Sequence, residues 1–143
     1  YTININKVKN NDNSIKFNGL TVDENKKYIY EIKAGTSINS IVDSISTNGK
    51  ISIIKDSDID VAATGQKLKI VFDDYSVEYI MIVKGDVNGD GKVTLSDVVT
   101  SLKRYRKKIE FTDYMFRAVD FNDDDEFDLS DVVNHLKYYK NNK

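Results

Sequence analysis

The residues of this chain best suited to chemistry are acidic side chains that occur in two similar sets near the C-terminus. The first set begins at Asp86 and the second at Asp120, 34 residues later, and each fills a twelve-residue segment. Carboxylate and amide side chains occupy positions 1, 3 and 5 of both segments, and a carboxylate closes each at position 12. Calcium binds six to eight such hard oxygens in a loop of this spacing. We therefore predict two Ca²⁺ ions, one in each segment.

An EF-hand-like loop supplies ligands from positions 1, 3 and 5, from the main-chain carbonyl at 7, and from positions 9 and 12. The predicted ligands of the first loop are Asp86, Asn88, Asp90, the carbonyl of Lys92, Thr94 and Asp97. Those of the second loop are Asp120, Asn122, Asp124, the carbonyl of Glu126, Asp128 and Asp131. Acidic turns also occur without an ion, but two complete copies, each leading into a helical pattern, favour calcium.

Both loops depart from the usual EF-hand pattern. Position 12 is Asp rather than Glu in each, and position 6, which needs a sharp turn, is Gly91 in the first loop but Asp125 in the second. A left-handed backbone costs free energy at a residue other than glycine, so we expect some strain in the second loop. Two carboxylates about 5 Å apart repel by about 3 kcal/mol at an effective dielectric constant of about 20. Calcium removes this repulsion, and its binding should therefore be coupled to folding.

Each loop is followed by apolar residues at helical spacing. The stripes expected to face the core are Val98, Leu102, Tyr105 and Ile109 after the first loop, and Val132, Leu136 and Tyr139 after the second. A short linking helix is expected between Phe111 and Val119. The single histidine, His135, falls in the last helix, where we expect it at the surface.

Residues 1–84 alternate apolar and polar side chains with a period of two, which is typical of half-buried strands. The expected strands lie around Ile3–Ile5, Ile15–Phe17, Tyr28–Ile32, Leu68–Phe72 and Val77–Val83. One segment differs, because Ile38, Ile41, Val42 and Ile45 follow a helical spacing after Thr36 and Ser37, either of which could cap a helix. The N-terminal part is therefore predicted to be a small β-rich module, immunoglobulin-like or a similar small sandwich, with one short helix.

Composition argues against several classes of function. The 143 residues carry a net charge of −2 without an extended basic face, which disfavours nucleic acid. No apolar stretch approaches the roughly 20 residues that would insert into a membrane as a helix. There is no cysteine, no G-x-S-x-G motif and no phosphate-binding glycine loop, so we do not expect an enzyme. Because the sequence starts at Tyr1, we expect it to be a fragment of a larger polypeptide.

The tandem loop–helix units of residues 85–140, with Asp at position 12, resemble a dockerin. This resemblance implies an all-α domain at residues 85–143 with two EF-hand-like calcium loops, which binds a cohesin domain of a scaffold protein. It also implies a secreted or cell-surface bacterial protein, as in cellulosomes that degrade polysaccharides. The β-rich domain at residues 1–84 resembles the X-modules that precede some dockerins, through the segments from Ile32 to Thr36 and from Val83 to Asp86.

In dockerins, loop positions 10 and 11 and the exposed face of the following helix meet the cohesin. The residues of this chain at such positions are Leu95, Ser96, Val99, Lys103, Lys107, Leu129, Ser130, Val133 and Lys137. Alternatives stay open: the serines could cap helices, the valines could lie in the core, and the lysines could be solvated surface. Because the two copies agree at most of these positions, either helix could face the same partner surface.

Two other functions are considered. The chain could be a calcium-stabilised structural or adhesion module of a surface protein without a cohesin partner. A calcium sensor is disfavoured, because sensors need a helix on both sides of each loop and a Met-rich groove, and this chain has only Met81 and Met115. Capture by a cohesin in calcium but not in chelator would separate docking from a structural role.

Overall fold

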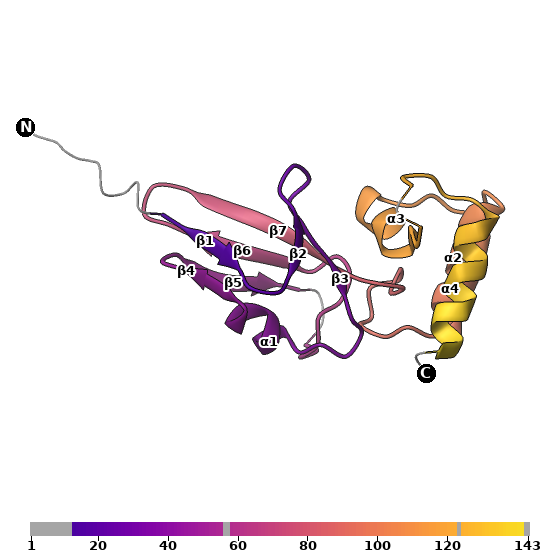
Figure 1. The fold of residues 1–143 in the computed structure, drawn as a ribbon, viewed down its shortest axis with the longest axis horizontal. Helices are drawn as coiled ribbons and strands as arrows, with labels where there is room; N and C mark the ends of the chain where they lie inside the picture. The colour runs from indigo at the N-terminus through magenta and orange to yellow at the C-terminus, as the bar shows by residue number, and fades with distance from the viewer. Residues whose placement is uncertain (1–12, 56–57, 123, 142–143) are drawn as a thin grey trace, which may run out of the picture.

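The computed structural model describes residues 13–55, 58–122 and 124–141. Strands occupy the first part of the chain up to Val83, and three helices make up the C-terminal part (Figure 1). This confirms a β-rich region followed by a helical region. The strand expected at Ile3–Ile5 lies outside the described residues. In the portion that is described, no helix has the length and apolar character needed to cross a membrane.

The described part of the β-rich region contains two sheets. The smaller sheet pairs β1 (Ile15–Phe17) with β4 (Ile45–Thr47), antiparallel. The larger sheet has the order β2 (Thr21–Asp23), β3 (Tyr28–Ile32), β7 (Ser76–Val83), β6 (Lys67–Val71) and β5 (Lys50–Ile54). Strands β3 and β7 run parallel, and the other neighbours in this sheet are antiparallel. Central strand β7 leads directly into the first acidic loop, so a buried strand fixes where that loop begins.

One face of the larger sheet forms the main core. Alternate residues such as Ile29 and Met81 point into it, with the smaller sheet and α1 (Ile38–Asp43) on the other side. Phe17 of β1 meets Tyr79 of β7 edge to face, with ring centroids 5.2 Å apart. Helix α1 begins where the apolar spacing predicted, and Ser37 caps it by accepting a hydrogen bond from the backbone N–H of Ser40.

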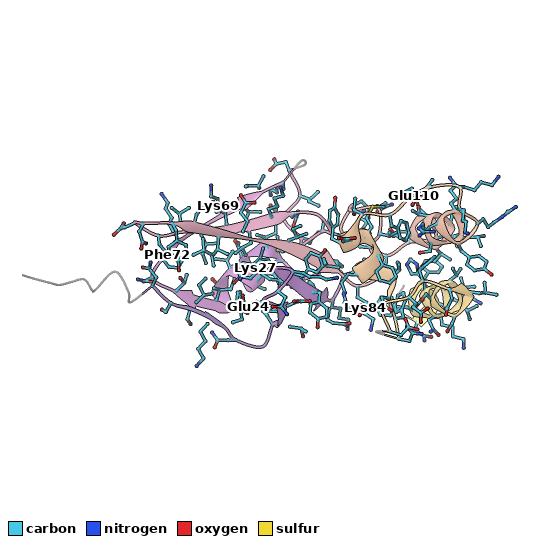
Figure 2. All side chains as sticks on the ribbon, turned by 90° about the horizontal axis from the view of Figure 1, so that it is seen from above. Glu24, Lys27, Lys69, Phe72, Lys84 and Glu110 are labelled. Atoms are coloured by element: carbon cyan, nitrogen blue, oxygen red, sulfur yellow. The ribbon has the colours of Figure 1, made fainter. Side chains whose placement is uncertain are left out.

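The opposite face of the same sheet carries the helical region. Because side chains alternate along a strand, Tyr28 and Ile82 point away from the main core and pack against Ala118 of α3 (Asp113–Val119). Helix α3 lies between the sheet and the two longer helices, α2 (Leu95–Tyr105) and α4 (Leu129–Asn141), in both views of the molecule (Figures 1 and 2). The β-rich region and the long helices therefore stand at opposite ends, joined through α3.

The packing of α2 against α4 corrects two expectations. His135 is fully buried rather than at the surface, while Leu102, Tyr105 and Leu136, expected in the core, are 41%, 41% and 36% exposed. The buried stripe instead contains Val98 and Ser101 of α2, and Val132 and His135 of α4.

Hydrogen bonds explain why polar residues occupy this interface. Ser101 Oγ lies 2.7 Å from His135 Nδ1, and His135 Nε2 lies 2.8 Å from the carbonyl oxygen of Gly85. Both imidazole nitrogens thus have partners, which removes most of the cost of burying the ring. The side on which the two helices meet is therefore marked by a hydrogen-bonded polar pair, while Leu102 and Leu136 lie at the surface.

Candidate metal centre and docking surface

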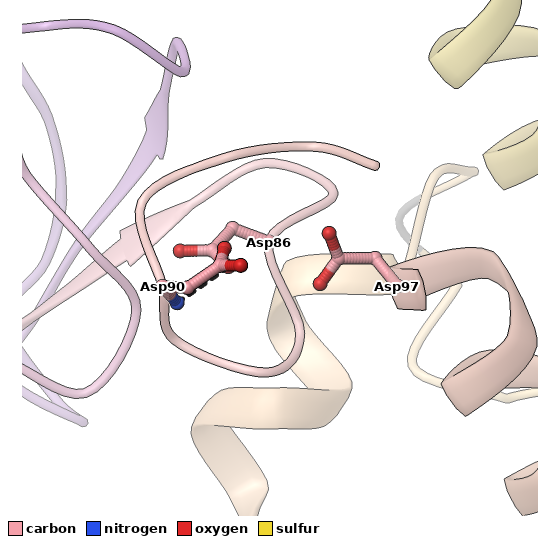
Figure 3. Close-up of side chains that lie close together, drawn as sticks. All are labelled: Asp86, Asp90 and Asp97. Atoms are coloured by element: carbon pink, nitrogen blue, oxygen red, sulfur yellow. Dashed lines mark hydrogen bonds between the residues drawn. The ribbon is translucent and has the colours of Figure 1, made fainter. Parts of the chain in front are cut away.

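The first acidic loop brings three carboxylates together. Asp86 lies three residues after the end of β7, Asp90 lies in the loop, and Asp97 belongs to the first turn of α2. One carboxylate oxygen from each lies within 4.8 Å of the others, and Figure 3 shows the carboxylates of Asp86 and Asp90 side by side, with the Asp97 side chain pointing toward them. A strand end and a helix start therefore converge on one point, as the spacing predicted.

Backbone N–H groups hold both end carboxylates of the first loop. The two Asp86 carboxylate oxygens accept hydrogen bonds from four backbone groups, those of Thr64, Gly89, Asp90 and Gly91. The Asp97 oxygens accept hydrogen bonds from the backbone of Val87, Asn88 and Thr94. The carboxylates are thus oriented by the main chain, which suits them to act as preformed ligands.

The electrostatics of the first loop favour a bound cation. Asp86 and Asp97 are both fully buried. Burial raises the pKa of Asp86 to about 7, the hydrogen bonds from Thr64 and Gly91 lower it in part, and the nearby charges of Asp97 and Asp90 raise it further. Burial likewise raises the pKa of Asp97. A divalent cation between these groups would offset both the desolvation and the mutual repulsion and keep the carboxylates ionised.

The second loop repeats the arrangement with different support. Asp120, Asp124 and Asp131 offer carboxylate oxygens within 4.8 Å of one another. Burial raises the pKa of Asp120, while the guanidinium of Arg117 lowers it in part, its nitrogen lying 3.9 Å from a carboxylate oxygen. Asp125, at position 6, has a φ of +61°, a left-handed conformation. The structure therefore places a non-glycine residue in the left-handed conformation for which the sequence predicted strain.

Several of the remaining predicted ligands take part in hydrogen bonds within the loops. Asn88 is exposed, and its Oδ1 accepts a hydrogen bond from the backbone of Asp90. Thr94 immediately precedes α2 as its N-cap residue. In the second loop, Asp128 accepts a hydrogen bond from the Asp131 backbone. Asn122 and the carbonyls of Lys92 and Glu126 complete the predicted set. Their ligand roles stay predictions.

The donor set fits calcium better than other common metals. Each cluster offers only oxygen, from three carboxylates, and the chain has no cysteine. Soft or borderline metals prefer sulfur and imidazole, whereas calcium prefers carboxylate and carbonyl oxygen. The single imidazole of the chain belongs to His135, which hydrogen-bonds to Gly85 and Ser101 instead. A calcium ion held here would supply positive charge that joins a loop to the start of the following helix.

The residues predicted to contact a partner are all exposed. They are Leu95, Ser96, Val99, Lys103, Lys107, Leu129, Ser130, Val133 and Lys137. Val99 and Val133 are each 43% exposed, so the alternative that they lie in the core is wrong. Ser96 is not a helix cap, because Thr94 is the N-cap residue of α2.

The structure adds residues to this surface that the sequence reading assigned to the core. Leu102 joins Leu95 and Val99 in an exposed apolar row on α2, here called the α2 stripe. The α4 stripe is its counterpart and consists of Leu129, Val133 and Leu136. Exposed apolar rows of this kind are uncommon on a surface without a partner. The missed signal was the polar pair Ser101 and His135 at the same repeat position, which marks the side where the helices meet.

The sequence also did not predict two residues that contact the loops. Thr64 lies 22 residues before Asp86 in the chain but donates its backbone N–H to that carboxylate over 3.1 Å. Arg117, at the end of α3, reaches Asp120 and, over 3.1 Å, Asp125. No local pattern predicts the first contact, because it depends on the tertiary packing of the β-rich region against the loop.

Comparison with known proteins identifies the helical part. Residues 84–137 match the family model of the dockerin type I domain. No curated protein and no solved structure matches the chain. The matched segment contains both loops, and dockerins of this kind are non-catalytic modules that bind calcium and dock to cohesin domains in extracellular bacterial proteins. The match leaves the β-rich region uncovered, so its likeness to an X-module stays a prediction. Residues 84–137 of this chain therefore form a dockerin type I domain that follows a β-rich region.

Proposed function

We propose that this chain is a calcium-dependent, non-catalytic docking module that attaches its parent protein to a scaffold or cell-surface complex. Its partner is a cohesin domain of a bacterial scaffold protein, as in cellulosomes. The single observation that carries this proposal is the pair of exposed apolar stripes on α2 and α4, each placed directly after an acidic loop. The family match supplies the partner class.

Calcium connects the loops to the docking surface. We propose that two ions bind, one to the loop of Asp86, Asp90 and Asp97 and one to the loop of Asp120, Asp124 and Asp131. Asp97 and Asp131 each belong to the first turn of the helix that carries a stripe. An ion that holds these carboxylates therefore also fixes the start of α2 or α4, and with it the orientation of the stripe.

The chemistry of the docking surface defines the partner surface that fits it. Each stripe offers leucine and valine at its centre, and the exposed lysines Lys103, Lys107 and Lys137 flank the stripes. A complementary cohesin presents an apolar patch bordered by Asp and Glu side chains. The apolar centre then supplies most of the affinity, while the charges steer association and set the orientation.

We propose that the two parts of the chain have different roles. Residues 85–143 dock, and residues 1–84 form an X-module-like domain that holds the dockerin from the side away from the stripes. Support comes from α3, which packs against Tyr28 and Ile82 on the sheet, while the stripes lie on α2 and α4 (Figure 1). The β module therefore leaves either stripe open to a partner.

A screen against immobilised cohesins tests the proposal. The full chain should be captured by at least one cohesin in calcium and released by excess chelator. Changing Leu102 and Leu136 together to Asp should abolish capture, whereas changing the exposed Val71 of the β module to Asp should not. A chain that binds calcium but is captured by no cohesin would contradict docking and favour the calcium-stabilised structural or adhesion module.

A further inference from the structure

The first calcium loop packs against a loop of the β module. The backbone N–H of Thr64 donates to Asp86 Oδ2 over 3.1 Å, and both residues are buried. The Thr64 hydroxyl is itself held by the backbone of Val83 in β7, from whose N–H it accepts and to whose carbonyl it donates. The donor that reaches the Asp86 carboxylate is therefore fixed to the central strand of the sheet.

Two glycines of the first loop lie where the β module leaves no room for a side chain. A Cβ atom on Gly89 would stand 2.8 Å from the carbonyl oxygen of Thr64. On Gly91 it would stand 2.9 Å from Cγ2 of Val61 and 3.4 Å from the carbonyl oxygen of Ala62. At 2.8 Å and 2.9 Å something must shift, and at Gly89 the neighbour is backbone, which cannot easily move; the 3.4 Å distance at Gly91 is close to ordinary van der Waals contact.

The second loop shows that glycine is not required by the loop itself. The residues at the corresponding positions of the repeat are Asp123 and Asp125. Asp125 adopts a φ of +61° where Gly91 has +83°, and its largely exposed side chain pairs with Arg117. An aspartate can thus occupy position 6 when its side chain is largely exposed beside an arginine. The need for glycine in the first loop follows from its contact with the β module.

We propose that residues 61–64 of the β module complete the first calcium site by positioning Asp86, so that the calcium affinity of the first loop, but not of the second, depends on the β module. The inference rests on the proposed binding of two calcium ions. Groups that orient a metal ligand without touching the metal commonly change metal affinity by about 10–100-fold when they are altered. Thr64 and Val61 are positioning residues in this sense.

Asp120 is the residue of the second loop that corresponds to Asp86, and it has a different neighbour. Asp120 faces the Arg117 guanidinium at 3.9 Å, whereas Asp86 accepts a neutral backbone N–H. A fixed positive charge beside a ligand opposes a divalent cation, while a neutral donor orients the ligand without that repulsion. The first site is therefore expected to bind calcium more tightly than the second.

A calcium titration of the full chain followed by ¹H–¹⁵N NMR tests the proposal, because the amides of residues 86–97 and 120–131 report each loop separately. The key variant is Gly91→Asn, since asparagine tolerates a positive φ but meets Val61. Asp125→Asn is the matched control at the same position of the second loop. Val61→Ala combined with Gly91→Asn removes the nearest contact and serves as the rescue.

The proposal predicts a specific pattern. Gly91→Asn should weaken calcium binding at residues 86–97 by about tenfold or more and leave residues 120–131 within about twofold. Adding Val61→Ala should recover most of that loss, and the Thr64 amide signal should shift together with the first loop. Asp125→Asn should leave the first loop unchanged.

Two results would overturn the proposal in distinguishable ways. If the wild-type chain shows no saturable calcium response in either loop, both the proposed function and this inference are wrong. If both loops bind calcium but Gly91→Asn has no effect on the first, or an effect that Val61→Ala does not reduce, the β module is not part of the site. The docking function would then stand alone.

Discussion

The two acidic loops are similar in sequence but lie in different surroundings. The first follows a buried central strand, packs against residues 61–64 and has an Asp86 carboxylate that accepts four backbone hydrogen bonds. The second follows α3, exposes Asp124 and Asp125 to solvent, and has an arginine beside Asp120. A duplicated motif can therefore keep its ligand spacing while each copy adapts to its own neighbours.

Removal of calcium should produce the largest effect on both loops. Without the ion, the buried carboxylates at each helix start repel one another, so α2 and α4 should lose their structure in excess chelator while the β module keeps its own. Far-ultraviolet circular dichroism should report a loss of helix. Hydrogen exchange should show the amides of residues 95–105 and 129–141 losing protection, with Thr64 losing it as well because its acceptor Asp86 is displaced. Unchanged helical signal in chelator would contradict this coupling.

The docking stripes provide the second test, because they extend the comparison from the loops to the helices. If either helix can face the cohesin, changing Leu95 and Ser96 to bulky charged residues should weaken binding by only about twofold, since the other orientation remains. The same change at Leu129 and Ser130 should be equally mild.

Combining the changes in both copies should abolish binding, which is the non-additive result expected of alternative contacts. Calorimetry on the three variants with a captured cohesin measures this. If one copy alone abolishes binding, the partner uses a single face.

The buried pair at matching repeat positions, Ser101 and His135, predicts a pH dependence of stability. Burial lowers the pKa of His135 to about 4, against 6.5 for an unperturbed histidine, while its bond to the Gly85 carbonyl offsets part of the shift. The unfolded chain therefore takes up this proton first as the pH falls. The contribution of His135 to the free energy of unfolding is fully present above pH 6.5. It declines by about 3 kcal/mol as the pH approaches 4.

Denaturant unfolding in saturating calcium at several pH values checks this expectation. His135→Gln is the matched control, because glutamine offers a donor and an acceptor but does not titrate. The difference in unfolding free energy between the wild type and this variant should shrink with falling pH. A difference that does not change between pH 7 and pH 4.5 would show that folding leaves the pKa of His135 unchanged.

Position 6 should give the smallest effect, and one of opposite sign in the two loops. Asp125→Gly relieves a positive φ and should stabilise the calcium-bound chain by about 0.5 kcal/mol, since the lost pair with Arg117 is largely exposed and worth little. Gly91→Asp should destabilise it, because the new side chain meets Val61. Thermal unfolding of both variants tests the contrast. Equal and opposite shifts would mean that backbone conformation alone matters.

Local sequence patterns predicted much of this structure. The carboxylate spacing in both loops, the capped helix after Ser37 and the strands expected at Ile15–Phe17, Tyr28–Ile32 and Val77–Val83 all follow from short-range periodicity, and the last strand begins one residue earlier than expected, at Ser76. Those features depend on neighbours a few residues apart. Ligand geometry of a calcium loop is local in the same way.

What the sequence did not predict depends on contacts between distant segments. The helical stripe was assigned through Leu102 and Leu136, because apolar residues normally mark the buried side, yet the Ser101–His135 hydrogen bond places polar residues there instead. Likewise, the packing of residues 61–64 on Gly89 and Gly91 joins two regions that the repeat pattern treated as separate. The first difference comes from hydrogen bonding between buried polar groups and the second from close packing of distant segments, and the spacing of apolar residues predicts neither.

The central claim is that each loop binds one calcium ion through its buried carboxylates, and counting bound calcium after equilibrium dialysis tests it most directly. The wild-type chain should hold two ions. Changing Asp86 and Asp97 to Asn should leave one ion, changing Asp120 and Asp131 to Asn should also leave one, and the four changes together should leave none. A single ion in the wild type, or two ions that survive either pair of changes, would contradict the account.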